Sequence, residues 1–106
     1  MRAHIPFPEQ DWKHLSRLQP LALERLSRRI LEEAQAMIAG AVEGEHHRVY
    51  LDLNRYIREQ DRVMADCFDR WSRSNALMIL LLWRRYNLIT DEEFAGFSPE
   101  TRARVG

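Results

Sequence analysis

A short segment, residues 43–47, holds residue types that can bind a metal ion. Glu43, Glu45, His46 and His47 occur within five positions. Glu43 and His46 stand three residues apart, and on a helix this Glu-x-x-His spacing presents a carboxylate and an imidazole to the same iron or manganese ion. We therefore take Glu43, His46 and His47 as candidate metal ligands.

A metal site of this kind, ferritin-like in its chemistry, needs further carboxylates from facing helices or from a symmetry-related copy. Glu32 and Glu33 are the obvious donors nearby in the sequence. Gly44 directly follows Glu43 and favours a turn, so the pair is not assured of lying on one helix. Metal binding is therefore the alternative hypothesis for this chain, and the main hypothesis assigns it no cofactor.

The chain offers little for nucleophilic catalysis. Cys67 is the only cysteine, and it falls in an apolar stripe with no histidine at helical reach. His4 and His14 lie in or near the first expected helix, where the sequence gives no geometry for a base. These observations predict a buried structural thiol and a non-enzymatic protein.

The elements that would position these residues are helical. Pro8 suits a first helical position and begins a short expected helix that Pro20 ends. Residues 21–39 are strong helix formers without an internal glycine or proline, and they predict a second, longer helix. Gly40 and Gly44 then favour a turn that reverses the chain into a third helix, so that the two long helices form an antiparallel hairpin.

Apolar residues recur every seven positions along both long helices. On residues 21–39 a large stripe accompanies a small one, formed by Ser27, Ala34 and Ala41, which would let a partner helix approach closely. The third helix has a broad apolar face, which indicates more than one packed neighbour. Gln60 lies in this face, where it can fix register or simply reach a backbone carbonyl. The predicted core and interface residues are Leu23, Ile30, Met37, Leu53, Tyr56, Gln60, Met64 and Trp71.

Charge argues against nucleic acid as a partner. The 16 basic residues balance the 16 acidic ones, which removes the positive field that such binding needs. On the third helix, acids such as Glu45 precede arginines such as Arg48 by three residues, a spacing typical of a solvated, self-neutralised face. Residues 84–86 are basic and aromatic, but the acidic residues 91–93 follow closely and can neutralise them.

Residues 76–83 are apolar throughout, a run far shorter than the roughly 20 residues that cross a bilayer. They predict a buried helix and no membrane contact. Whether residues 45–86 form one helix or two is open, although Ser72, Ser74 and Asn75 favour a break. Asn87 suits a left-handed helix end, Thr90 with Glu93 matches a capping box, and Ser98 with Pro99 predicts a last helix start.

These patterns together predict one all-α domain over residues 1–106. Its architecture would be a helical bundle built on a long antiparallel helical hairpin, with short flanking N- and C-terminal helices. We expect the hairpin's apolar face to bind a second copy, as a homodimer, or another helical protein. The single cysteine and the lack of an apolar leader in the first residues predict a cytoplasmic location.

Overall fold

The computed structural model describes residues 6–106, and this part of the chain is helical without a strand. The prediction of an all-α protein is confirmed. Two long helices come first, and short elements follow them. The elements are α1 (Glu9–Ala39), α2 (His46–Met64), a π-helical turn (Ala65–Asp69), a 3-10 turn (Arg73–Asn75), α3 (Ala76–Arg85), α4 (Asp91–Ala95) and α5 (Pro99–Val105).

The expected break at Pro20 is wrong, because α1 continues through it as one helix of 31 residues. An interior proline removes a hydrogen bond and costs about 3 kcal/mol. Leu15 and Leu18 before Pro20, and Ala22 and Leu26 after it, are buried in the same core. Burial on both sides of Pro20 outweighs the local cost, so residues 9–19 belong to α1 and do not form a separate helix.

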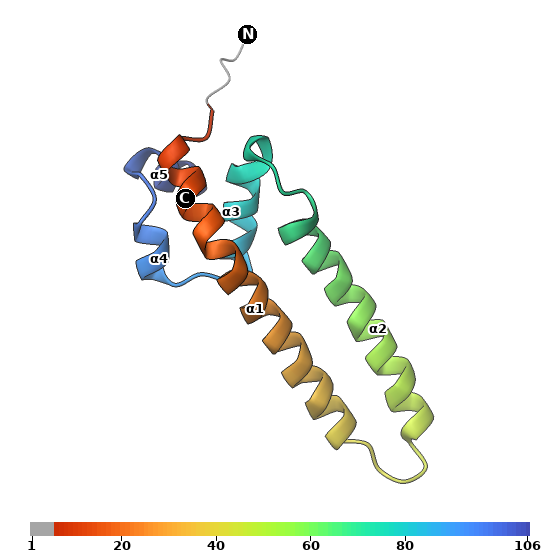
Figure 1. Cartoon of the computed structure of the whole chain (residues 1–106). Coiled ribbons are helices and arrows are strands. Elements are labelled where there is room, and N and C mark those ends of the chain that lie inside the picture. The colour runs from red at the N-terminus through yellow and green to blue at the C-terminus, as the bar shows by residue number, and fades with distance from the viewer. Residues whose placement is uncertain (1–5) are drawn as a thin grey trace.

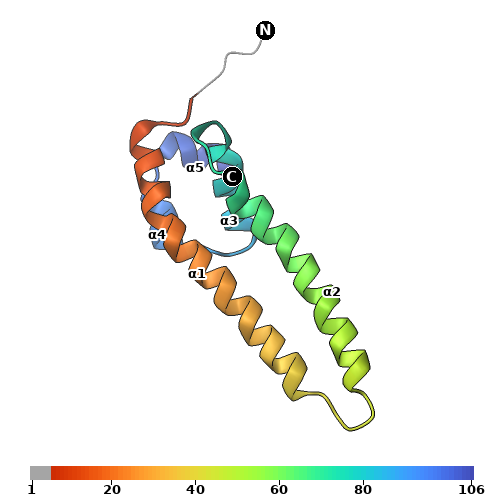
Figure 2. The same ribbon diagram turned by 45° about the vertical axis from the view of Figure 1, so that its right-hand side comes forward.

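Helices α1 and α2 run side by side in opposite directions (Figures 1 and 2). Residues 40–45 connect them, and Gly44 in this turn has a φ of 89°, a left-handed value that suits glycine. The molecule measures 59 × 32 × 20 Å, and its radius of gyration is 17.5 Å. A compact chain of this length would have a radius of about 13 Å, so the long helices extend well beyond a compact end.

The predicted break between the third expected helix and the apolar residues 76–83 is confirmed. Helix α2 ends at Met64, one π-helical turn follows, and Ser72 is extended before the 3-10 turn that leads into α3. The local signals beyond α3 are also confirmed: Asn87 has a φ of 57°, and Thr90 forms a capping box at the start of α4.

The core lies at the end of the molecule where both termini of the described chain meet. We call this end the head: the described residues up to Leu26, and everything from Cys67 onward. Its buried apolar residues are Phe7, Leu15, Leu18, Ala22, Leu26, Cys67, Ala76, Ile79, Leu80, Trp83, Leu88, Ile89 and Phe97. The prediction that residues 76–83 form a buried helix holds for one face of α3, which lies in the core, while Met78 on the other face is 58% exposed.

Residues 27–66 form what we call the arm. They comprise the rest of α1, the turn, α2 and the first two residues of the π-helical turn. None of its residues is buried. Only the head-ward end of the arm contacts the head, where Arg29 bonds to the end of α3 and Ile30 and Met64 pack against the core. Toward the turn, the two helices lie beside each other alone, because α3, α4 and α5 lie beside the head-ward part of α1 (Figure 1). No described helix has the length and apolar content required to cross a membrane.

Candidate functional site

The candidate metal ligands lie at the far end of the arm. Glu43 is in the turn, and His46 is the first residue of α2, so the two do not share a helix as the Glu-x-x-His spacing requires. Both histidines are exposed, and the ring of His47 stacks on Tyr50 with centroids 6.0 Å apart. Within residues 6–106, no three His, Cys, Asp or Glu side chains gather in a way that could hold a metal ion.

Glu32 and Glu33, the expected additional donors, are exposed on α1. The acid–arginine pairs expected on α2 occur at its start. Arg48 contacts Glu45 at 2.6 Å and Asp52 at 3.3 Å. These exposed pairs neutralise the solvent side of α2 and contribute little stability.

Cys67 is fully buried in the π-helical turn. Burial raises the pKa of its thiol to about 11, and the nearby charge of Asp66 adds to the shift. The indole Nε1 of Trp83 donates to the Cys67 carbonyl at 3.1 Å, which anchors this turn on α3. A thiol in such surroundings is a poor nucleophile, so Cys67 has a packing role.

His14 belongs to a contact between α1 and the C-terminal segment. Its Nε2 lies 2.8 Å from the Glu93 carbonyl oxygen, and its ring packs edge-on against Phe97. Gly96 leaves room for this ring, because a Cβ there would lie 2.5 Å from Nε2. The other histidine considered as a base, His4, lies outside the described residues.

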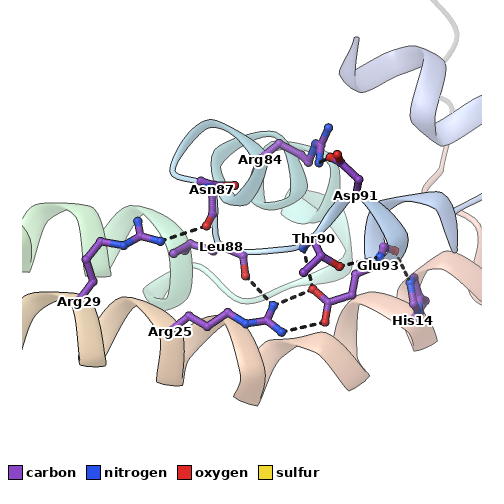
Figure 3. A network of polar contacts seen from close by, with 9 residues as sticks. All are labelled: His14, Arg25, Arg29, Arg84, Asn87, Leu88, Thr90, Asp91 and Glu93. Carbon is purple, nitrogen blue, oxygen red and sulfur yellow. Dashed lines mark hydrogen bonds and ion pairs between the residues drawn. The ribbon is translucent and has the colours of Figure 1, made fainter.

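A polar network fastens residues 86–93 to α1 (Figure 3). Arg25 contacts both carboxylate oxygens of Glu93, at 2.6 and 3.0 Å, and also donates to the Leu88 carbonyl. Arg29 donates to the carbonyls of Tyr86 and Asn87, which close α3. The bidentate pair holds the pKa of Glu93 at about 2, chiefly through the hydrogen bonds from Arg25. No local pattern predicts the contacts of Arg25 and Arg29, because their partners are more than 55 residues away in the sequence.

The basic and aromatic segment, residues 84–86, lies at the end of α3 and contacts the C-terminal part of the chain. Arg84 contacts Asp91 at 3.0 Å, as expected, and its guanidinium lies 4.1 Å from the centre of the Phe94 ring. Arg85 remains exposed beside an open hollow of about 560 Å³. Intramolecular pairing thus engages Arg84, whereas Arg85 keeps its exposed position.

Asp11 makes a second buried connection to the C-terminal segment. Its Oδ1 accepts from the Ser98 backbone N–H at 2.8 Å, and its Oδ2 accepts from the hydroxyls of Ser98 and Thr101 at 2.6 and 2.5 Å. Burial alone would raise the pKa of this carboxyl, but the three hydrogen bonds hold it below its usual value. These contacts fix α5 against α1 and serve stability.

The surface left without such a partner is on the arm. A hollow of about 330 Å³ opens between the two helices near the turn, lined by Ile38, Ala41, His46, Val49, Tyr50 and Leu53. Ile38 and Tyr50 at its rim are 57% and 61% exposed. Leu31, two turns before Ile38 on the same side of α1, is 68% exposed. We call this side, with Ile57 seven residues after Tyr50, the outer face of the arm.

The outer face points away from the head. On α1, Leu26 is buried in the head and Arg25 and Arg29 bind the segment after α3. Leu31 lies five residues beyond Leu26, which places it about 140° around the helix from that side. A partner can therefore lie along the outer face without meeting the head.

The eight predicted core and interface residues are all half-buried. Ile30, Met64 and Trp71 pack against the core of the head. Leu23, Met37, Leu53, Tyr56 and Gln60 keep part of their surface exposed. The heptad spacing predicts the main core in the hairpin, whereas the fully buried residues lie in the head.

Comparisons of the chain with models of known protein families, with curated proteins and with solved structures found no match.

Proposed function

We propose that the protein is a non-enzymatic interaction module whose arm binds a second copy through the outer face. The observation that carries this proposal is the exposure of Leu31, Ile38 and Tyr50 on one side of an arm that buries no residue of its own. Exposed apolar side chains grouped in this way are typical of protein–protein interfaces.

The area supports a second copy as the occupant. Since a large side chain carries roughly 150–250 Å² of surface, Leu31, Ile38, Tyr50 and their half-buried neighbours expose on the order of 500 Å² of apolar surface. Two copies of this patch with their polar rims reach roughly the 1,200 Å² at which specific interfaces begin. The geometry is also suitable, because two helices laid face to face on two more make a four-helix bundle, the architecture expected from the sequence.

Charge is compatible with self-association. The arm has six arginines and eight acidic residues, so neither sign dominates. A strongly acidic or basic partner would gain little from such a surface, whereas a second copy meets no strong repulsion. The predicted cytoplasmic location forms part of this proposal.

The test is the dimer dissociation constant of the full-length protein, measured by analytical ultracentrifugation over a wide concentration range. In Tyr50→Glu, each copy loses an aromatic side chain from the interface, so the binding free energy of the dimer loses the contribution of two tyrosines. At about 1.5 kcal/mol per side chain, we expect the constant to rise by more than 100-fold.

Leu51→Glu is the matched control, because Leu51 is adjacent, similarly apolar and 47% exposed, but does not line the outer hollow. It should leave dimerisation within about threefold, a change of under 1 kcal/mol. A wild-type protein that stays monomeric at high micromolar concentration, or equal effects of the two substitutions, would refute the proposal.

Native mass spectrometry of protein purified without chelator gives a second reading of the same question. A metal-free dimer supports the interaction module. Stoichiometric iron, manganese or zinc would instead favour the metal hypothesis on Glu43, His46 and His47, and would overturn the proposal.

A further inference from the structure

We infer that the two arms associate antiparallel, so that the tip of each arm lies beside the head-ward end of the other. This inference rests on the proposed function and adds the orientation of the partner. It comes from the different chemistry of the two ends of the outer face.

The head-ward end of the outer face carries carboxylates on both helices. On α1, Glu24, Leu31 and Ile38 are spaced seven residues apart and so share one side of the helix. On α2, Asp61 follows Ile57 by four residues, which places it on the outer side as well. Both acids are exposed.

The arginine nearest to Asp61 on this side is engaged elsewhere. Arg58 precedes Asp61 by one helical turn, but its Nε donates to the Asn54 side chain at 3.1 Å. Among residues 6–106, neither Glu24 nor Asp61 forms an ion pair, so both head-ward carboxylates are available for a partner.

The tip end of the outer face carries imidazoles instead. His46 lines the hollow, and His47 stacks on Tyr50. The acid closest to them on α2, Glu45, is paired with Arg48 at 2.6 Å. A histidine N–H can donate to a carboxylate.

A parallel pair of arms would bring Glu24 and Asp61 against the same two residues of the second copy. Four carboxylates would then gather at one end of an apolar interface, which is unfavourable. An antiparallel pair places them beside the partner's His46 and His47. The twofold axis then passes near Leu31 and Leu53, midway between the acidic and imidazole ends.

The antiparallel arrangement also matches the apolar part of the face. Tyr50 and Ile38 lie toward the tip, and Ile57 lies toward the head. The tip-side residues of one arm then lie beside the head-ward part of the other, while Leu31, near the axis, lies beside the partner's Leu31. The small side chain of Ala34 leaves space for a large one. The heads lie on the far sides of the two arms and do not interfere.

Pulsed electron–electron resonance on spin-labelled dimers of the full chain tests the orientation. One variant, Glu43→Cys, carries the nitroxide at the tip, and a second, Gln35→Cys, carries it close to the proposed axis. Buried Cys67 should resist labelling because its thiol has a pKa of about 11. Mass spectrometry of labelled wild type checks this.

Antiparallel arms put the two tip labels about 30 Å apart along the axis, since each lies some ten residues from the midpoint at 1.5 Å per residue. The Gln35 labels should be separated by only about 12 Å along the axis, by the same rise per residue. A tip distance longer than the central distance by about 20 Å supports the inference.

Equal, short distances at both positions would mean parallel arms. That result overturns the inference while the proposed dimer stands. A dimer in which neither pair of labels comes close, or a monomer in ultracentrifugation, would overturn the proposed function as well.

Discussion

Replacing Asp11 by Asn should destabilise the head more than any other isosteric change on α1. Asp11 is 1% exposed and accepts three hydrogen bonds, two from Ser98 and one from Thr101. These bonds join residues 87 and 90 positions apart, so they connect the first turn of α1 to the last helix.

The cost follows from the geometry. The amide oxygen of Asn can still accept from the two hydroxyls at Oδ2, but its NH₂ group then faces the Ser98 backbone N–H. Leaving that buried donor unsatisfied costs about 1–3 kcal/mol, and the two remaining bonds lose their charge assistance, about 0.5 kcal/mol each. We expect a loss of about 3 kcal/mol in the free energy of unfolding.

Urea unfolding followed by circular dichroism at 222 nm measures this loss, at one fixed protein concentration so that association does not contribute. A loss of about 3 kcal/mol should also lower the Tm by roughly 12–24 °C for a domain of this size. Asp69→Asn is the control, since Asp69 is exposed at the end of the π-helical turn and should change stability by less than about 0.5 kcal/mol. If Asp11→Asn costs under 1 kcal/mol, the account of Asp11 as the anchor of α5 is wrong.

Three further predictions concern the head. The folded pKa of Glu93, about 2, lies below its ordinary value of 4.5. The ionised carboxylate therefore contributes about 2 kcal/mol to the free energy of unfolding above pH 4.5, and this contribution is lost as the pH falls toward 2. Glu93→Gln should flatten the dependence of the unfolding free energy on pH across that window. Gly96→Ala places a methyl group against His14 and should cost about 1–2 kcal/mol by overpacking, a penalty that His14→Ala in the same chain should largely remove. Pro20→Ala should stabilise α1 by about 1–3 kcal/mol in thermal unfolding, because it restores a backbone donor inside a continuous helix; a destabilised variant would show that α1 depends on the proline.

The sequence predicted best where the signal is local. The capping box of Thr90 and Glu93, the left-handed Asn87 and the helix start at Ser98 each depend on residues within a few positions, and each is present. The same holds for the pairing of Glu45 with Arg48.

Long-range contacts were not predictable in this way. Pro20 is a strong local signal for a helix end, but burial of Leu18 and Ala22 on either side outweighs it. Arg25 and Glu93 are 68 residues apart, and only the fold brings them together. The burial of Asp11 against Ser98 likewise depends on a distant segment, which the local pattern around Asp11 does not identify.

The position of the core was predicted only in part. Heptad spacing identified the apolar side of both long helices, but spacing alone does not say how many helices will cover it. In the structure α3 and the C-terminal segment cover the head-ward part of these helices, and toward the turn each long helix has only the other as a neighbour. The candidate interface therefore lies where the heptad pattern predicts burial but no other helix of the same chain covers the apolar side chains.

An arm without a buried residue should also differ from the head in how its backbone opens. Amide hydrogens in the head are protected by a shared core and should exchange only when that core unfolds, whereas those of residues 27–66 should exchange through local fraying that starts at the turn. If a second copy covers the outer face, exchange in the arm slows as protein concentration rises while exchange in the head does not change. The head would then keep the same protection from exchange at every protein concentration, whereas the protection of the arm would depend on the fraction of the protein that is dimeric.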